Sequence, residues 1–109
     1  MDSWHAQMRK GVVDLAILAQ VGRGETYGYE IVENLRRYGG LEMTESTVYP
    51  ALTRLARDGA LAVRSAASPN GPPRRYYRLT DDGRDRLARM ASGWSAMARS
   101  ITLMLEGDP

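Results

Sequence analysis

Apolar residues near the start of the chain recur at helical spacing. Residues 11–21 are apolar on almost every side, which is typical of a buried helix. The glycines at 22–24 are expected to end that helix. The same apolar stripe continues upstream, so the helix is expected to begin before Arg9. The upstream stripe consists of Trp4, Met8, Val12 and Leu15.

A second amphipathic segment predicts a helix from a cap at Thr26 through Tyr38. Gly39 and Gly40 follow it and should stop it. Because one face of this segment is apolar, that face is expected to pack against the first helix. The inward residues would be Tyr27, Ile31, Leu35 and Tyr38.

A third helix is predicted from a cap at Thr44 or Ser46 to a stop at Gly59. Pro50 conflicts with a regular start, because proline lacks a backbone donor and bends a helix that has already begun. We therefore expect an irregular first turn. The buried face would consist of Val48, Ala51, Leu52 and Leu55.

Two strand-like runs follow, at residues 61–64 and 74–79, and a turn rich in Ser, Pro, Asn and Gly separates them. Successive side chains of a strand point to opposite faces. In the second run, Arg74 and Tyr76 should therefore face outward. The residues expected to face the core are Tyr77 and Leu79.

The last helix is predicted to begin after a cap at Thr80, with acidic residues in its first turn. Its apolar positions alternate between spacings of four and three, which is typical of a seam between paired helices. This stripe either folds back onto the core or pairs with a second subunit. We favour pairing, because the first three helices already cover one another. The seam consists of Leu87, Ala91, Trp94, Ala98, Ile101 and Leu105, widened by Met90, Met97 and Met104.

Composition adds limits rather than a function. The chain has 109 residues, enough for one domain, and a net charge of +2. Lys10 is the only lysine, so all other basic side chains except His5 are arginines. Arginine suits two-pronged contacts to phosphates. A genome that favours arginine codons would explain the same bias equally well. Cysteine is absent, and no segment reads as a signal peptide or a membrane span, so a cytoplasmic chain is expected.

The order of these elements is that of a winged helix-turn-helix, a mainly helical α+β fold. Such a domain places one helix in the major groove of DNA and a cationic hairpin, the wing, beside the phosphates. We expect residues 1–79 to form the DNA-binding domain, with a two-stranded wing. Residues 80–109 would form a long dimerisation helix within the same compact unit.

Short motifs along the chain make the prediction more specific. They are residues 9–11 (RKG), 27–31 (YGYEI), 47–52 (TVYPAL), 54–55 (RL), 58–59 (DG), 71–77 (GPPRRYY) and 79–80 (LT), followed by Gly83. In this order and at these spacings, the chain resembles the PadR family of bacterial transcriptional regulators, in the short form with one C-terminal helix. The resemblance covers most of the sequence, from about Met8 to Leu105.

This resemblance implies a homodimeric repressor that binds a palindromic operator in double-stranded DNA. The third helix of each subunit would enter the major groove, and the C-terminal helices would form most of the dimer contact. Some family members sense small aromatic or lipophilic molecules, and binding of the effector lowers their affinity for DNA. A small effector of this kind is therefore a possible partner here.

Eight residues are candidates for DNA contact. Hydroxyls at the start of the third helix can reach base edges or phosphates, although capping would also explain Ser46 and core packing would also explain Tyr49. A core position is likewise the alternative for Tyr27. Arg54, on the same helix side as Thr47, is a candidate phosphate contact. The full set is Lys10, Tyr27, Ser46, Thr47, Tyr49, Arg54, Arg74 and Arg75.

Nine residues are candidates for a cavity at the dimer centre. Trp94 would stack a flat ligand there, or it would simply anchor the packed interface, which we favour because tryptophan dominates interfaces in general. The full set is Trp4, Met8, Val12, Leu15, Leu87, Ala91, Trp94, Met97 and Ile101.

Two other functions fit the same pattern. One is a winged-helix module for protein interaction whose arginines stay solvated, and the other is a ligand sequestrant built on the dimer cavity. Catalysis lacks a recognisable set of residues, because there is no Cys–His pair, phosphate loop or compact carboxylate pair. His5 is the only histidine. We therefore expect no enzyme activity, metal or cofactor.

Overall fold

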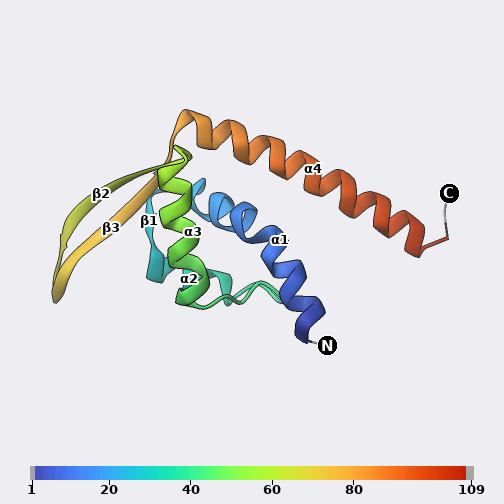
Figure 1. Ribbon diagram of the computed structural model, residues 1–109, viewed down its shortest axis with the longest axis horizontal. Coiled ribbons are helices and arrows are strands. Elements are labelled where there is room, and N and C mark those ends of the chain that lie inside the picture. Colours follow the sequence, from blue (N-terminus) through green and yellow to red (C-terminus); the bar gives the residue numbers. More distant parts are fainter. Residues whose placement is uncertain (1, 108–109) are drawn as a thin grey trace.

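The computed structural model describes residues 2–107 and contains four helices and three strands in that range (Figure 1). The elements follow the predicted order, with one additional short strand before the second helix. They are α1 (Asp2–Val21), β1 (Thr26–Tyr27), α2 (Gly28–Leu35), α3 (Glu45–Arg57), β2 (Leu61–Ser68), β3 (Gly71–Leu79) and α4 (Asp81–Leu105). Asp108 and Pro109, which belong to the predicted C-terminal region, lie outside the described residues.

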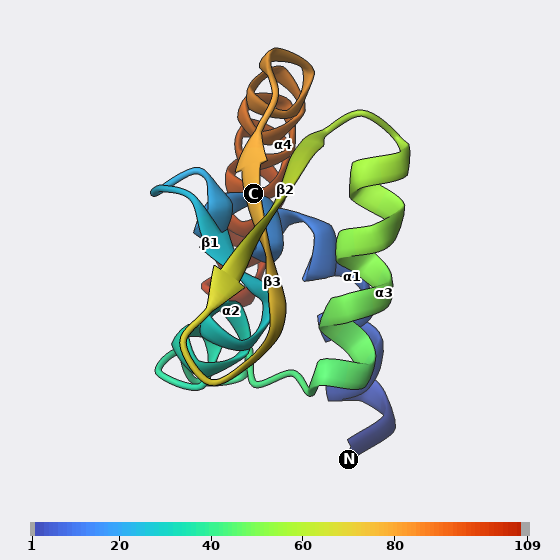
Figure 2. The same cartoon turned by 90° about the vertical axis from the view of Figure 1, so that its left-hand side faces the viewer.

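Helices α1, α2 and α3 pack around one apolar core, and the sheet covers one side of it (Figures 1 and 2). The β2–β3 hairpin and α4 leave this body toward opposite ends of the long axis, so the molecule measures 54 × 32 × 20 Å. All four residues predicted for the buried face of α3 are buried. The largest fully buried side chains come from the three helices: Ile17, Leu18, Ile31, Val32, Leu35, Val48, Leu52 and Leu55.

The sheet has three strands, not two, in the order β1-β3-β2 with antiparallel pairing. Thr26 was expected to cap α2, but it pairs with Tyr77 in the sheet and is buried. Its hydroxyl donates a hydrogen bond to the Glu30 carboxylate. The cap position belongs to Tyr27 instead, and no side chain caps α2 there. A strand of two residues is too short to show an alternating apolar pattern in the sequence, so it can be recognised only by its pairing with β3.

The wing strands are longer than the sequence indicated, because they reach Ser68 on one side and Gly71 on the other. Pro72 and Pro73 lie within β3, near the tip, where that strand has a partner on only one side. The register shifts between Ala66 and Ser68, which is an irregularity of the kind that accommodates proline in a sheet. The Ser68 hydroxyl also donates a 2.9 Å hydrogen bond to the Pro72 carbonyl.

The end of the second helix and the first turn of the third differ from the prediction, whereas Thr44 is at the cap position of the third helix as one of the two expected alternatives. Helix α2 ends at Leu35, and Tyr38 is exposed rather than inward, with its hydroxyl accepting a 3.2 Å hydrogen bond from Arg23. Helix α3 begins at Glu45 and continues through Pro50 without an irregular turn. The proline removes only one backbone bond, which Pro50 would donate to the carbonyl of the exposed Ser46, so water can satisfy that carbonyl.

The junction between β3 and α4 is tightly built. The Thr80 side chain accepts a 2.9 Å hydrogen bond from the Gly83 backbone and donates one of 2.6 Å to the Gly59 carbonyl, so the predicted cap is confirmed. A Cβ at Gly83 would lie 2.0 Å from the Ala60 carbonyl oxygen, which explains why glycine stands there. Helix α4 therefore starts in close contact with the body.

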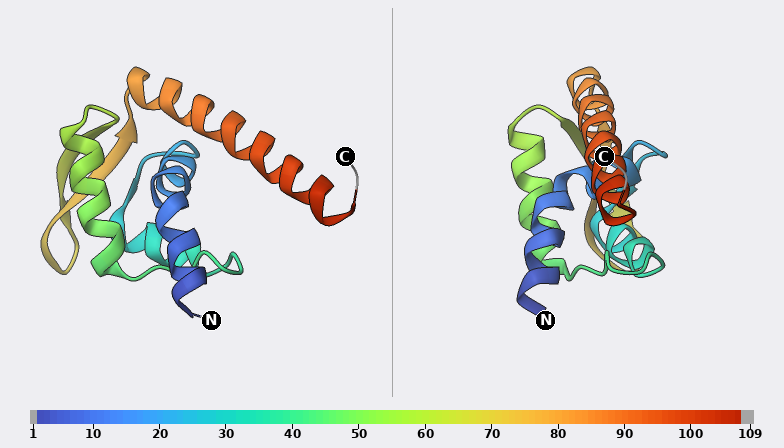
Figure 3. Two further views of the ribbon diagram at one scale, coloured as in Figure 1. Left: turned by 45° about the vertical axis from the view of Figure 1, so that its right-hand side comes forward. Right: turned by 90° about the vertical axis from the view of Figure 1, so that its right-hand side faces the viewer.

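Beyond that start, α4 does not fold back onto its own core (Figure 3). Leu87 and Met90 pack against the core, whereas the later large apolar residues are exposed. The exposed fractions are 49% for Trp94, 63% for Met97, 54% for Ile101, 68% for Met104 and 83% for Leu105. The fold-back alternative is therefore wrong for most of the helix.

Candidate nucleic-acid interface

The exposed face of α3 carries hydroxyl groups. Thr47, Tyr49 and Thr53 are exposed, with Tyr49 and Thr53 on the edge of the helix toward the wing and Thr47 on the edge toward α1. Ser46 is also exposed, and its hydroxyl lies 2.8 Å from that of Thr44, so neither hydroxyl caps the helix backbone. The capping interpretation of Ser46 is thus not supported. Helix α3 presents polar groups outward because every fourth or third position is used for the core.

Tyr49 is both packed and accessible. A Cβ at Gly28 would lie 2.0 Å from Cε1 of the Tyr49 ring, so the ring lies against the first residue of α2. The side chain still leaves 41% of the residue exposed. Burial, together with the Glu45 carboxylate, raises the pKa of the Tyr49 phenol, so the hydroxyl is protonated at neutral pH and can donate a hydrogen bond. The two interpretations of Tyr49 are therefore compatible.

The base of the wing holds a stack of cations and rings. The Arg74 guanidinium lies 4.2 Å from the centre of the Tyr27 ring, and Tyr27 meets Tyr76 edge-on at 5.4 Å. Arg64 lies 4.8 Å from the Tyr76 ring and forms a salt bridge of 2.6 Å with Glu25. The stack restrains Arg74 and occupies one face of Tyr27, because cation–π contact favours a guanidinium over the ring.

Tyr76 was expected to face outward but was not predicted as a site residue, and neither were two other members of this stack, Arg64 and Glu25. They lie far apart in the sequence, and no local motif joins them. The signal that identifies Arg64 is its strand position, which pairs directly with Tyr76 across the hairpin. Only the correct register of the longer strands reveals that pairing.

The wing and the helices enclose a groove of about 600 Å³. Tyr49 and Thr53 of α3 line one side, Tyr27 lines the floor, and Arg74 and Arg75 of β3 line the other side. Tyr77 and Leu79 are buried, as the strand alternation predicted, whereas Arg75, on the same face but nearer the wing tip, is exposed. Arg74 and Tyr76 were expected to face outward, but they are only half-exposed because the stack with Tyr27 and Arg64 covers them. The groove therefore combines hydroxyls, aromatic rings and cations from segments that are distant in sequence.

Lys10 flanks the other edge of α3. It is exposed on α1 and lines two small hollows together with Thr47. The ammonium group is thus available to solvent beside the start of α3, where a phosphate would be favoured by the helix N-terminus.

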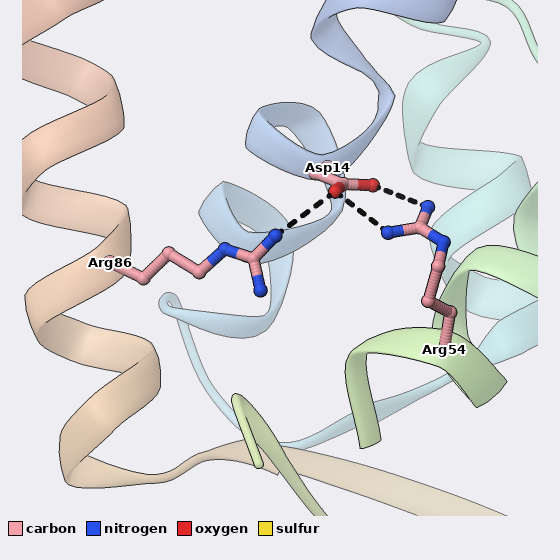
Figure 4. Close-up of polar contacts among 3 residues, drawn as sticks. All are labelled: Asp14, Arg54 and Arg86. Atoms are coloured by element: carbon pink, nitrogen blue, oxygen red, sulfur yellow. Dashed lines mark hydrogen bonds and ion pairs between the residues drawn. The ribbon is translucent and has the colours of Figure 1, made fainter. Parts of the chain in front are cut away.

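Arg54 has a partner that the sequence did not indicate. Its guanidinium donates two hydrogen bonds to the Asp14 carboxylate of α1, of 2.8 and 2.9 Å (Figure 4). Arg86 of α4 adds a third contact of 3.3 Å to the same carboxylate. The hydrogen bonds from Arg54 hold the pKa of Asp14 below its ordinary value, against burial, and the charge of Arg86 contributes. The sequence offered one sign of this ion pair, because Asp14 is an acidic residue within an otherwise apolar helical segment.

An apolar groove of about 750 Å³ lies between α1 and α4. Six of the nine predicted cavity residues line it: Met8, Val12, Leu15, Trp94, Met97 and Ile101. Within one chain, the other three lie elsewhere. Leu87 packs on the core, Trp4 contacts the His5 ring edge-on, and Ala91 is exposed outside the groove. Met90 of α4 lines the groove and was not predicted to do so.

Residues 17–89 match the transcriptional regulator PadR-like family. The chain belongs to this family. The match runs from within α1 through α2, α3 and the β2–β3 hairpin into the first part of α4, so it covers more than half of the chain. The winged helix-turn-helix and the long C-terminal helix are thereby confirmed, and the protein is a transcriptional regulator of the PadR family.

Individual relatives agree. A transcriptional regulator of Mycobacterium tuberculosis is 32% identical over 95 residues, which cover 87% of each chain. A PadR-like regulator of Bacillus cereus has a TM-score of 0.82 at 32% identity, covering 94% of this chain and 99% of that one. A PadR-family regulator of Eggerthella lenta has a TM-score of 0.84 at 30% identity, covering 96% and 91%.

One solved relative is bound to DNA. Bacillus subtilis PadR in complex with operator DNA has a TM-score of 0.68 at 28% identity, covering 73% of this chain and 46% of that one. Within residues 2–107, no helix of the present chain is long and apolar enough to cross a membrane. The same described range contains no cluster of acidic or histidine side chains arranged for a metal ion.

Proposed function

We propose that this PadR-family chain acts as a homodimeric repressor that binds a palindromic operator in double-stranded DNA. The observation that carries the proposal is the groove between the polar face of α3 and the arginine-bearing wing. A helix of this kind fits the major groove, and the wing then lies beside the phosphates. The operator complex of Bacillus subtilis PadR supports the DNA part of the proposal for a relative of the same fold.

The candidate residues divide into two groups in this proposal. Thr47 and Tyr49 contact base edges, because both are exposed near the start of α3, one on each edge of the surface that would enter the major groove. Phosphates are contacted by cations and hydroxyls around that face, namely Lys10, Tyr27, Ser46, Arg74 and Arg75. Arg54 enters the proposal through Asp14, which holds both of its terminal nitrogens.

A second copy of the chain covers α4 in this proposal. The exposed residues Trp94, Met97, Ile101 and Leu105 form one continuous apolar face, which a monomer would leave in water. Residues 1–79 then form the DNA-binding domain, and residues 80–109 form the dimerisation helix. Pairing of two copies places the two α3 helices about one turn of DNA, roughly 34 Å, or a multiple of it, apart.

We further propose that the groove between α1 and α4 accepts a small aromatic or lipophilic effector. Its volume of about 750 Å³ falls in the range of ligand pockets, and Trp94 offers a flat ring for stacking. An effector in the groove would change the packing of α4, and with it the distance between the two α3 helices. Operator affinity would then fall.

A salt titration on the DNA upstream of the chain's own gene tests the main proposal. Operator binding should weaken log-linearly with salt, with a slope of about −0.9 for each phosphate neutralised. Random DNA of the same length is the control, and it should bind more weakly at every salt concentration. Binding that is indifferent to salt and to sequence would favour the protein-interaction alternative.

The ligand-sequestrant alternative is favoured by one observation, the apolar groove beside Trp94. Fluorescence quenching of Trp94 by aromatic compounds, measured together with operator affinity, separates it from the main proposal. Trp4 lies outside the groove, so a Trp4→Phe variant keeps the signal specific. Quenching without any change in operator affinity would support sequestration.

A further inference from the structure

Three charged side chains from three helices meet at one point. Asp14 of α1 lies between Arg54 of α3 and Arg86 of α4, which approach its carboxylate from opposite sides (Figure 4). The residues are separated by 40 and 72 positions from Asp14 in the sequence. This set, which we term the Asp14 joint, connects the proposed DNA-reading helix with the proposed dimerisation helix.

We propose that the Asp14 joint fixes the orientation of α3 relative to α4 and thereby makes the dimer selective for one spacing between operator half-sites. The inference rests on the proposed function, because half-site spacing has a meaning only for a dimer on an operator. It assigns Arg54 and Arg86 as positioning residues, which act on DNA through the placement of α3.

The geometry suits a positioning role better than a stabilising one. The side chains are 41% exposed for Arg54, 21% for Asp14 and 32% for Arg86. Ion pairs with this degree of exposure contribute little to the free energy of unfolding. A two-pronged arginine–carboxylate contact nevertheless restricts direction, because both N–H groups must stay in line with the carboxylate oxygens.

The joint is also unequal on its two sides. Arg54 contacts both oxygens of Asp14, whereas Arg86 contacts only Oδ2 and at a longer distance. Loss of Arg86 therefore removes the ion-pair link between α4 and Asp14 and leaves the connection between α1 and α3 intact. Loss of Asp14 releases both arginines. The two changes should give graded effects on the same measurement.

The position of Met90 links the joint to the apolar groove. Met90 follows Arg86 by one helical turn, packs against the core and lines the hollow that contains Asp14 and Arg54. The same side chain lines the groove beside Trp94. A displacement of α4, by the partner subunit or by a ligand in the groove, thus acts on the contact between Arg86 and Asp14 before it reaches α3.

The experiment compares operators whose half-sites are kept at the natural spacing or moved by one and two base pairs. The wild-type dimer should lose affinity sharply on the altered operators. Arg86→Gln should reduce this discrimination by about two- to thirtyfold, the range found for residues that modulate coupling between two sites, and Asp14→Asn should reduce it further. Arg86→Lys keeps the positive charge and should restore part of it.

Arg84→Gln is the matched control. Arg84 lies on the same helix and has an ion pair of 3.0 Å, but its partner is Asp81 of that helix, so no other element is connected. This variant should keep the wild-type spacing profile. Thermal melting of each variant should show that all of them remain folded, because the joint is not a main source of stability.

The distance between the two α3 helices of the dimer provides a second measurement, which would not change if the Asp14 joint only stabilised the fold. The chain has no cysteine, so Arg57→Cys at the exposed end of α3 gives one spin label per subunit. The distance distribution between the two labels in the free dimer should be narrow in wild type and in Arg84→Gln. It should be broader in Arg86→Gln and broadest in Asp14→Asn.

An unchanged spacing profile and unchanged label distances in Arg86→Gln and Asp14→Asn, with operator binding retained, would overturn the joint and leave the proposed function standing. A gain of operator affinity in Asp14→Asn without loss of spacing selectivity would also overturn it, because Arg54 would then be a phosphate contact that Asp14 restrains. If the wild-type chain ignores every operator, the proposed function itself fails.

Discussion

Helices α3 and α4 treat their apolar faces in opposite ways. Helix α3 buries its aliphatic face, Val48, Ala51, Leu52 and Leu55, against α1, α2 and the sheet and exposes a mainly polar surface. Helix α4 partly buries Leu87 and Met90 near its start and exposes the rest of its apolar face. One chain is therefore sufficient to build and orient the surface proposed to contact DNA, whereas the apolar face of α4 stays exposed within one chain.

The largest expected effect concerns α3, whose aliphatic face is covered within one chain. Leu52→Ala removes a side chain that is fully buried in α3, so we expect the free energy of unfolding to fall by about 2–5 kcal/mol. Urea unfolding followed by circular dichroism measures this loss. Thr53→Ala, on the exposed face of the same helix, should leave the unfolding midpoint nearly unchanged. Similar losses in both variants would contradict the division of α3 into a buried and an exposed face.

A second prediction concerns the exposed apolar face of α4. Trp94→Ala should weaken the dimer by about 2 kcal/mol, or roughly thirtyfold in the dissociation constant, as for a central interface residue. Analytical ultracentrifugation over a range of concentrations measures it. Ser92→Ala changes an exposed residue on the other side of α4 and serves as the control. An unchanged dissociation constant for Trp94→Ala would show that this face does not hold the dimer.

A third prediction joins α2 to α3. Gly28→Ala would place a methyl group 2.0 Å from the Tyr49 ring, so the ring must move. We expect a loss of about 1–3 kcal/mol in stability and weaker operator binding. Gly11→Ala, where the added methyl group meets nothing within 4 Å, should show neither loss. Adding Tyr49→Ala to Gly28→Ala should recover stability but not operator binding, and failure of that recovery would place the strain elsewhere.

The smallest effects separate the two kinds of DNA contact. Arg75→Ala should weaken binding to all sequences and make the salt slope shallower by about one, because it removes a phosphate contact. Thr47→Ala should change the preference among operator variants by about 1 kcal/mol or more and leave the salt slope as it is. Fluorescence anisotropy with operator and random duplexes measures both. Equal effects of the two variants on both duplexes would contradict this assignment.

Periodicity predicted most of the fold. The buried face of α3, the inward positions of Tyr77 and Leu79 and the cap at Thr80 all follow from local patterns, because each depends on residues close in sequence. The exposed seam of α4 followed from the same reasoning, since three helices already enclose a core.

The missed features depend on contacts between distant segments. Strand β1 exists only because Thr26 and Tyr27 lie beside β3. The ion pairs of Arg54 with Asp14 and of Arg64 with Glu25 join residues about 40 positions apart, and a charge pattern does not specify which partner it meets. The contact of Tyr49 with Gly28 likewise required the packing of two helices.

The turn that leads into α4 limits how such a protein can change over evolution. Thr80 donates hydrogen bonds to the carbonyls of Gly59 and Ala60, and Gly83 packs closely against Ala60, so the first turn of α4 is held against this segment. Inserting one residue after this turn would rotate the rest of the helix by about 100°. The apolar stripe would then no longer face the surface against which it is proposed to pack. New pairing preferences are therefore easier to acquire by exchanging side chains along the stripe than by altering the length of the chain before it.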